Sequence, residues 1–488
     1  MKLKNLANTA LQKYRSFPMA AKASFWFIVC SIIQRGISFL TTPIFTRVMS
    51  TEQYGQVTLF NSWINVICIF TTLNLQSGSF NTAQIKFAND RKAYTSSVQG
   101  LVFVISGVAL VLFALFGKYV TGFMERPVFM MLVMVIQINA RFNTSLWMAN
   151  CRFDFKYKAM TVVILLSCVL GQAASLLWVL NSQEKGYTRL IAVALVEVLF
   201  GLGITLYNQI QGKKFFSKQY WKYALGFNLP LVPYYLSQII FSSSDRIMIS
   251  NMVSVEKAGI YGLAYTVALL LSFVVTAIRN SYTPWFFKTV KAGDGNAIKR
   301  ISTLITGAVA VMLMLFVFVA PELLLLMGGD AYMEAVWIIP PLVTGLLFEF
   351  FTDPACNVLF YYEKKGSLVT ATVGCAVVNI ILNYLGIKWL GYFATAYSTL
   401  ISYILFWVFL YISAAGECRR NDMAPGVYLI PKAQALMGLA CLGIAGGCMA
   451  LYPYVYVRYG VLAALLIVAV CNYKKLLAVV QQIAAMRK

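Results

Sequence analysis

Apolar stretches long enough to cross a lipid bilayer recur fourteen times in this sequence, and they constrain its fold more than any other feature. They lie near residues 23–46, 55–78, 96–117, 127–149, 159–180, 190–210, 224–249, 258–284, 300–320, 335–360, 366–386, 391–414, 432–451 and 456–473. About 20 apolar residues in a helix span a hydrocarbon core of roughly 30 Å. Because lipid offers the backbone no hydrogen-bond partners, we expect helices throughout and an all-α integral membrane protein.

The composition excludes a soluble domain and argues against an enzyme. Hydrophobic residues make up 60% of the 488 residues and charged residues only 12%, whereas an average soluble domain is about 25% charged. Histidine, the usual general base and metal ligand, is absent, and the ten cysteines are scattered. We therefore expect no catalytic residue, no metal site and no cofactor other than H⁺ or Na⁺ as a coupling ion.

Lysine and arginine are distributed unequally between the two ends of the expected helices. The amino terminus, the even-numbered loops and the carboxyl terminus hold 28 of the 40 basic residues, and the odd-numbered loops hold 8. The positive-inside rule therefore predicts that both termini are cytoplasmic. The net charge of +23 is then explained by anionic lipid headgroups without any nucleic acid. Residues 2–17 suggest a short basic helix on the membrane surface or a disordered tail.

Two similar blocks suggest an internal repeat. Ser-Thr-Glu-Gln-Tyr-Gly at 50–55 follows the first span, and Ser-Val-Glu-Lys-Ala-Gly at 254–259 follows the seventh. In each block the serine and glutamate can cap the next helix, so a chance likeness of loops is the alternative. A true repeat predicts pseudo-symmetric six-helix lobes at 1–218 and 219–415, with two additional helices and a tail at 416–488.

The segments around these blocks resemble a known family. Residues 34–55, Gln-Arg-Gly-Ile-Ser-Phe-Leu-Thr-Thr-Pro-Ile-Phe-Thr-Arg-Val-Met-Ser-Thr-Glu-Gln-Tyr-Gly, resemble the first-helix signature of Wzx-type polysaccharide and O-antigen flippases. These belong to the MOP superfamily, which also contains MurJ-type lipid II flippases and MATE drug exporters. Asp-Arg-Ile-Met-Ile at 245–249 and Glu-Lys-Ala-Gly-Ile-Tyr at 256–261 agree with it.

The resemblance implies a transport function. Its substrate would be an undecaprenyl-diphosphate-linked oligosaccharide, moved by alternating access from the cytoplasmic to the periplasmic leaflet of the bacterial inner membrane. Membrane lipids and a polysaccharide polymerase of the same pathway are the implied partners. MurJ-type flippases carry cavity arginines in helices 1 and 8, which implies such a role for Arg35 and Arg279. Their further arginines in helices 1 and 2 have no counterpart here, which argues against lipid II as the cargo.

Charges at membrane depth are functional candidates because each costs about 2.5–3.5 kcal/mol on insertion scales. We expect substrate contacts from Arg35, Arg141 and Arg279, although each arginine could instead form a structural ion pair. A guanidinium suits a diphosphate because it is planar and remains charged. Asp245 and Arg246 are further substrate-binding candidates, or else an interfacial pair that orients its helix.

Three carboxylates are candidates for ion coupling. Glu349 and Asp353 are four residues apart, so one helix would present both on the same face. Two such carboxylates cannot both ionise cheaply in a low dielectric, so they could share a proton or a cation. Pairing with an arginine and a lipid-facing position at a misjudged boundary remain alternatives. Glu197 is a third, isolated candidate.

Pro230 and Pro233 are the candidate hinge, because each removes a helical hydrogen bond; a static kink is the alternative.

Two other functions compete with flipping. A MATE-like drug or cation exporter would favour acidic residues in the amino-terminal lobe, where the deep charges are mainly arginine. A polysaccharide polymerase or ligase would need a long outer loop with catalytic arginine or histidine, and no such loop is expected.

Overall fold

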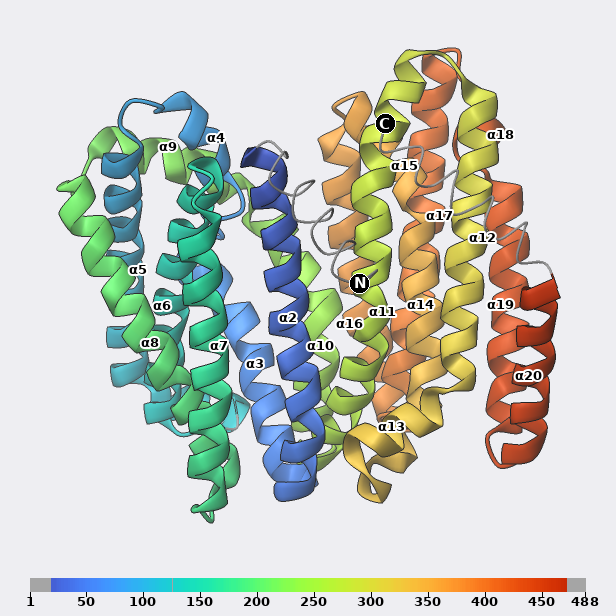
Figure 1. Ribbon diagram of the computed structural model, residues 1–488, viewed down its shortest axis with the longest axis horizontal. Coiled ribbons are helices and arrows are strands. Elements are labelled where there is room, and N and C mark those ends of the chain that lie inside the picture. The colour runs from blue at the N-terminus through green and yellow to red at the C-terminus, as the bar shows by residue number, and fades with distance from the viewer. Residues whose placement is uncertain (1–18, 125, 472–488) are drawn as a thin grey trace, which may run out of the picture. The chain divides into compact units, whose positions relative to one another are not determined.

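The computed structural model describes residues 19–124 and 126–471 and divides the chain into two compact units (Figure 1). Unit 1 is Met1–Leu236 and unit 2 is Ser237–Lys488. The described residues are helical, with no strand among them. The suggested amino-terminal helix at 2–17 lies outside the described residues. The predicted division at 218/219 and 415/416 stays a prediction, because compactness does not test a repeat.

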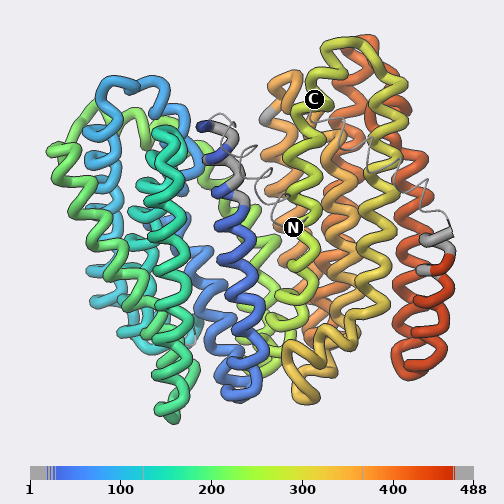
Figure 2. The backbone as a smooth tube through the Cα atoms, viewed as in Figure 1, coloured from blue at the N-terminus to red at the C-terminus, as the bar shows by residue number. Residues whose placement is uncertain are grey.

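Unit 1 is built from successive antiparallel helices joined by short connections (Figure 2). Its helices are α2 (Met19–Val48), α3 (Thr51–Thr72), α4 (Ser79–Lys86), α5 (Arg91–Met124), α6 (Val128–Phe153), α7 (Tyr157–Leu180), α8 (Lys185–Gly212), α9 (Lys218–Asn228), the 3₁₀ turn η1 (Leu229–Leu231) and the start of α10 (Val232–Met252).

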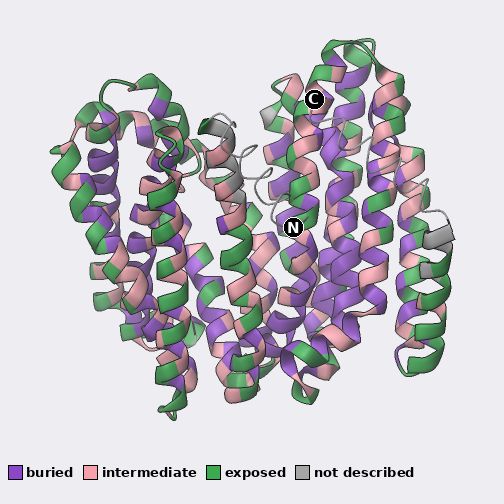
Figure 3. Ribbon diagram, in the orientation of Figure 1, coloured by how far each residue is buried: buried purple, intermediate pink, exposed green. Residues whose placement is uncertain are grey.

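Unit 2 buries its central helix α14 against α11, α12, α17 and α19, as Figure 3 indicates by colour. Its elements after α10 are α11 (Val255–Lys291), α12 (Gly295–Phe318), α13 (Ala320–Gly328), the 3₁₀ helix η2 (Asp330–Ile338), α14 (Ile339–Phe351), α15 (Asp353–Tyr361), α16 (Lys365–Leu390), α17 (Ala394–Arg420), α18 (Pro425–Tyr428), α19 (Pro431–Leu451) and α20 (Val455–Cys471).

The expectation of a multi-helix membrane protein is confirmed. Each of the fourteen apolar stretches overlaps helix in the structure. Eleven helical segments of the described chain are long and apolar enough to cross a membrane. The count of fourteen spans therefore stays a prediction, with α2, α3 and α20 as the three further helices.

The serine of each similar sequence block caps the next helix, and in the first block Gln53 completes the cap in place of the expected Glu52. The Ser50 hydroxyl accepts a hydrogen bond from the Gln53 amide at 3.1 Å, and the Gln53 side chain accepts from the Ser50 amide at 3.2 Å. Ser254 accepts from the Lys257 amide at 3.1 Å at the start of α11. Such caps satisfy amide groups that have no partner within the helix.

A cluster rich in aromatic side chains fixes one end of unit 1. Tyr94 on α5 stacks on Phe87 at 5.3 Å between ring centroids and meets Tyr220 of α9 edge-on at 5.4 Å. Phe80 of α4 is fully buried in the same cluster. Buried aromatic pairs of this kind add about 0.5–1.5 kcal/mol beyond their burial. The cluster therefore holds α4 and α9 on the end of α5.

Prolines interrupt two of the expected spans. Pro230 lies in η1, and Pro233 is the second residue of α10. Residues 224–249 therefore form α9, η1 and α10 instead of one helix. The boundary between the two units follows at 236/237. A break at this position is compatible with the predicted hinge, which stays a prediction. Pro354 opens α15 in the same manner.

Helices α6 and α8 approach closely at Gly201. A Cβ atom built on Gly201 would lie 2.6 Å from the Cβ of Ala140, closer than real Cβ contacts. Gly203, two residues further on α8, would meet nothing within 4 Å. The side chain at position 201 must therefore be absent for these helices to pack.

We predict that Gly201→Val destabilises unit 1 by about 1–3 kcal/mol, the usual cost of overpacking, because it pushes α6 away from α8. Unfolding of the purified protein in detergent micelles measures this change. Gly203→Val is the matched control, since it makes the same substitution in the same helix without the clash. Equal stability of the two variants would contradict the packing.

Candidate functional site

Arg141 on α6 and Glu197 on α8 form a bidentate ion pair within unit 1. Arg141 donates from Nε to Glu197 Oε2 at 2.6 Å and from NH2 to Oε1 at 3.2 Å. Gln137, one turn before Arg141, donates to the same Oε2 at 2.8 Å. Two parallel charge-assisted bonds are the strongest common arrangement of such a pair. The isolated carboxylate expected at Glu197 therefore has a guanidinium partner, and the structural alternative for Arg141 is realised in this structure.

Arg35 lies near the middle of α2, and its side chain is exposed on unit 1. Cys30, on the same helix, contacts Thr161 of α7 at 3.2 Å. At 100° per residue, Arg35 points about 140° away from Cys30 and thus away from α7. Its guanidinium lies about 20 Å along the helix axis from Val48, too deep to reach the end of the helix easily.

Arg279 on α11 contacts both carboxylates that were expected on one helix face in unit 2. Its Nε donates to Asp353 Oδ2 at 2.8 Å, and NH2 lies 3.3 Å from Glu349 Oε1. Asp353 is 7% exposed. Pairing with an arginine, one of the alternatives left open by the sequence, is therefore present. With both carboxylates ionised, this cluster would carry one negative charge in excess.

A helix break separates the two carboxylates of this cluster. α14 ends at Phe351, and α15 begins at Asp353, so the two carboxylates come from two consecutive helices. Between them, the Thr352 hydroxyl donates to the Glu349 carbonyl at 2.6 Å. Pro354 cannot donate a helical hydrogen bond, and this restriction accounts for the new start at Asp353.

Asp245 on α10 is the most buried of the predicted site carboxylates, at 2% exposed. Three neutral groups donate to it: the Tyr261 hydroxyl at 2.7 Å, the Asn383 amide at 2.7 Å and the Thr399 hydroxyl at 3.0 Å. These donors come from α11, α16 and α17. Hydrogen bonds to a buried carboxylate lower the cost of removing it from water.

Arg246 points to a different neighbour from that of Asp245. Its guanidinium carbon lies 4.3 Å from the centroid of the Tyr265 ring on α11. A cation over an aromatic face gains about 0.5–2 kcal/mol. The two adjacent charges thus anchor α10 to its neighbours through separate contacts, and their predicted contact with substrate stays a prediction.

Neutral partners of the charged groups escaped the sequence reasoning. They are Gln137, Tyr261, Asn383 and Thr399, with Asn379, which accepts from Asn383 at 3.2 Å. Asn379 and Asn383 lie four residues apart inside an otherwise apolar stretch. Two amides on one face of a membrane helix need polar partners, so this spacing was a usable signal.

Solved structures of membrane proteins share this fold. The chain is similar to the lipid II flippase MurJ in an inward closed conformation, with a TM-score of 0.65 and 13% identity over 92% of this chain and 99% of that one. It is also similar to a multidrug resistance MATE family transporter of the MOP superfamily, with a TM-score of 0.60 and 13% identity over 80% of this chain and 95% of that one. The chain therefore shares the fold of these two proteins.

The particular family follows from sequence. The chain belongs to the family described as polysaccharide biosynthesis protein, whose model matches residues 20–290. The predicted resemblance to polysaccharide exporters of the MOP superfamily is thus confirmed.

Two curated relatives come from Haemophilus influenzae. Protein 1 of the Lsg locus is 21% identical over 55% of this chain, and the match spans 66% of that protein, just under two thirds. A membrane protein is 22% identical over 75% of this chain and 88% of its own length.

We predict that the Arg141–Glu197 pair behaves as a coupled unit. Arg141→Gln or Glu197→Gln alone should cost about 1–3 kcal/mol of unfolding free energy, because each leaves one charge without its partner. The double variant should cost less than the sum of the two single variants. Detergent unfolding of the four proteins gives the coupling energy. Additive losses would contradict the pair, and Asp154→Asn, at an exposed ion pair, should cost only about 0–1 kcal/mol.

Proposed function

We propose that this protein is a flippase for undecaprenyl-diphosphate-linked oligosaccharide repeat units of O-antigen, capsule or a related polysaccharide. It transfers them by alternating access from the cytoplasmic to the periplasmic leaflet of the bacterial inner membrane, with both termini in the cytoplasm. It performs transport and no chemical step, and a polysaccharide polymerase of the same pathway receives the flipped unit.

The exposed Arg35 guanidinium in the middle of α2 is the observation that carries this proposal. A guanidinium pairs with phosphate oxygens through two parallel hydrogen bonds, and it remains charged at any physiological pH. Membership of the polysaccharide biosynthesis family supports a cargo that contains sugars. The diphosphate of a lipid-linked oligosaccharide combines both chemical features.

We predict that Arg35→Gln lowers flipping of undecaprenyl-diphosphate oligosaccharide in proteoliposomes by at least about tenfold, the usual effect of losing a charge-assisted hydrogen bond. Arg47→Gln on the same helix is the matched control, because Arg47 lies in the last turn of α2, beside its end. Folding is checked by the unfolding transition in detergent. Equal activity of the two variants would contradict the role of Arg35.

The proteoliposome assay also distinguishes the second candidate function. If the wild-type protein moves no lipid-linked oligosaccharide but expels a cationic dye, the protein is a MATE-like drug or cation exporter.

The cluster of Arg279, Glu349 and Asp353 is the proposed site of ion coupling. Its two carboxylates share one guanidinium, so a proton or a Na⁺ would neutralise the excess negative charge. Arg141 and Glu197, in contrast, neutralise each other, which makes Glu197 the weaker of the predicted coupling residues. Binding and release of one cation at the unit 2 cluster would link its charge to the transport cycle.

We predict that flipping by the wild-type protein responds to an imposed H⁺ or Na⁺ gradient and that Asp353→Asn abolishes this response, because the cluster is then neutral without a bound cation. Each gradient is imposed separately on proteoliposomes. Asp330→Asn, at an exposed carboxylate of η2, is the control and should respond as the wild type does. A response that survives in Asp353→Asn would place the coupling elsewhere.

A further inference from the structure

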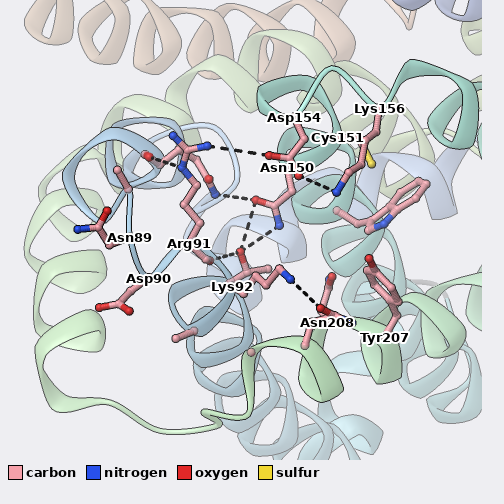
Figure 4. A pocket seen from close by; sticks show the side chains of 17 residues that line it. Asn89, Asp90, Arg91, Lys92, Asn150, Cys151, Asp154, Lys156, Tyr207 and Asn208 are labelled. Carbon is pink, nitrogen blue, oxygen red and sulfur yellow. Dashed lines mark hydrogen bonds and ion pairs between the residues drawn. The ribbon is translucent and has the colours of Figure 1, made fainter.

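A cavity of about 400 Å³ opens at one end of unit 1 (Figure 4). The connection between α4 and α5, the start of α5, and the last turns of α6 and α8 enclose it. Its volume lies within the range of small-molecule sites, about 300–1,000 Å³. The charge distribution of the loops predicts that this end is cytoplasmic. We call it the α5 cavity; its lining includes Gln84, Arg91, Lys92, Asn150, Lys156 and Asn208.

Cations outnumber carboxylates around the α5 cavity. Arg91, Lys92 and Lys156 line it together with Asp154 and Asp90. Two of the cations share the Asp154 carboxylate: Lys156 Nζ lies 2.9 Å from its Oδ2, and Arg91 NH1 lies 4.0 Å from its Oδ1. Lys92 donates to the side-chain amide oxygen of Gln211 at 2.8 Å. Because this amide is neutral, the contact does not neutralise the charge of Lys92. In addition, α5 begins at Arg91, so the positive end of its helix dipole faces the same region. The cavity therefore favours an anion.

Lys156 keeps its positive charge through its contact with Asp154. The hydrogen bond from Lys156 to Asp154 raises the pKa of the Lys156 ammonium above its usual value. Figure 4 shows Lys156 and Arg91 directed toward Asp154 from different sides of the cavity.

Two buried amide side chains of the lining have unused hydrogen-bonding atoms. Gln84 is 1% exposed and Asn208 is 5% exposed. Gln84 Nε2 donates to Asn150 Oδ1 at 2.7 Å, but Gln84 Oε1 has no hydrogen-bond partner among the described residues. The same is true of Asn208 Nδ2. One of these atoms accepts a hydrogen bond and the other donates one.

The lining thus includes one unused donor and one unused acceptor, which distinguish between kinds of anion. Phosphate oxygens accept hydrogen bonds and can satisfy Asn208, but a fully ionised phosphate ester has no proton for Gln84. A hydroxyl group both donates and accepts, so it suits either amide. A buried polar group without a partner is unfavourable, and a ligand that bonded to both atoms would remove this penalty.

We propose that the α5 cavity binds a phosphate ester with neighbouring hydroxyl groups. This chemistry is shared by a soluble sugar phosphate and by the glycerophosphate headgroup of phosphatidylglycerol. The phosphate lies against Lys92, Lys156 and the start of α5, and the hydroxyls bond to Gln84 and Asn208. The proposal does not depend on flipping, because the cavity lining contains none of the arginines assigned to transport.

The soluble source is tested by calorimetry on the full-length protein in detergent. Glucose 1-phosphate should bind saturably, and more tightly than inorganic phosphate or glucose alone. Lys156→Gln should weaken its binding by at least about tenfold, through loss of a charge-assisted contact. Lys158→Gln removes the same charge from an exposed residue outside the cavity and should leave the affinity unchanged.

The lipid source is tested by native mass spectrometry of the protein from nanodiscs of phosphatidylglycerol and phosphatidylcholine. The lipid is the occupant if the wild-type protein and Lys158→Gln retain phosphatidylglycerol but Lys156→Gln does not. The retained lipid should then also block the binding of glucose 1-phosphate. Saturable glucose 1-phosphate binding without such retention identifies a soluble ligand. Binding in neither experiment, or equal effects of the two lysine variants, overturns the proposal.

The hydroxyl contacts have their own test. Asn208→Leu removes the unused donor at a nearly constant volume and should weaken glucose 1-phosphate binding more than inorganic phosphate binding. Equal losses for both probes, or no loss for either, would refute recognition of the hydroxyls.

Discussion

The cost of an ionised side chain in hydrocarbon governs how the polar residues of both units are arranged. Such a charge can be kept only if a counter-charge or several hydrogen-bond donors lie within reach. Arg141 with Glu197 in unit 1 and Arg279 with its two carboxylates in unit 2 meet this requirement by pairing. Asp245 meets it with three neutral donors. The helices that supply these partners must therefore pack together.

Each unit also contains a pair of asparagines that joins neighbouring helices. In α6, Asn143 donates to Asn139 at 2.9 Å, and Asn139 donates to Ser106 of α5 at 3.2 Å. In α16, Asn383 donates to Asn379 at 3.2 Å, and Asn379 donates to Ser402 of α17 at 3.3 Å. Amides four residues apart thus link one helix to the next within each unit. Interhelical hydrogen bonds of this kind average about 0.6 kcal/mol each in membranes, so their role is to set register more than to supply stability.

Breaks in helices position the groups that could act in transport. A continuous helix would present Glu349 and Asp353 on one face, whereas the break at Thr352 starts a second helix at Asp353 and still leaves both beside Arg279. Irregular backbone is tolerated at membrane depth only where protein surrounds it, and α14 is the most enclosed helix of unit 2. In the proposed coupling mechanism, a cation bound at this cluster would neutralise its excess carboxylate.

The sequence by itself determined the class of fold and the family. A long apolar segment must be helical because the backbone in lipid has to form its hydrogen bonds within the segment. This requirement is local, so it can be recognised in the sequence. The deep charges could be found in the same way, since any charge within an apolar stretch is conspicuous. Only the tertiary structure decided which charges pair: Arg141 and Glu197 are 56 residues apart, and Arg279 and Asp353 are 74. Partner choice depends on helix packing and rotation, which hydropathy does not encode. The α5 cavity likewise exists only because four chain segments converge, so the sequence of any one segment does not predict it.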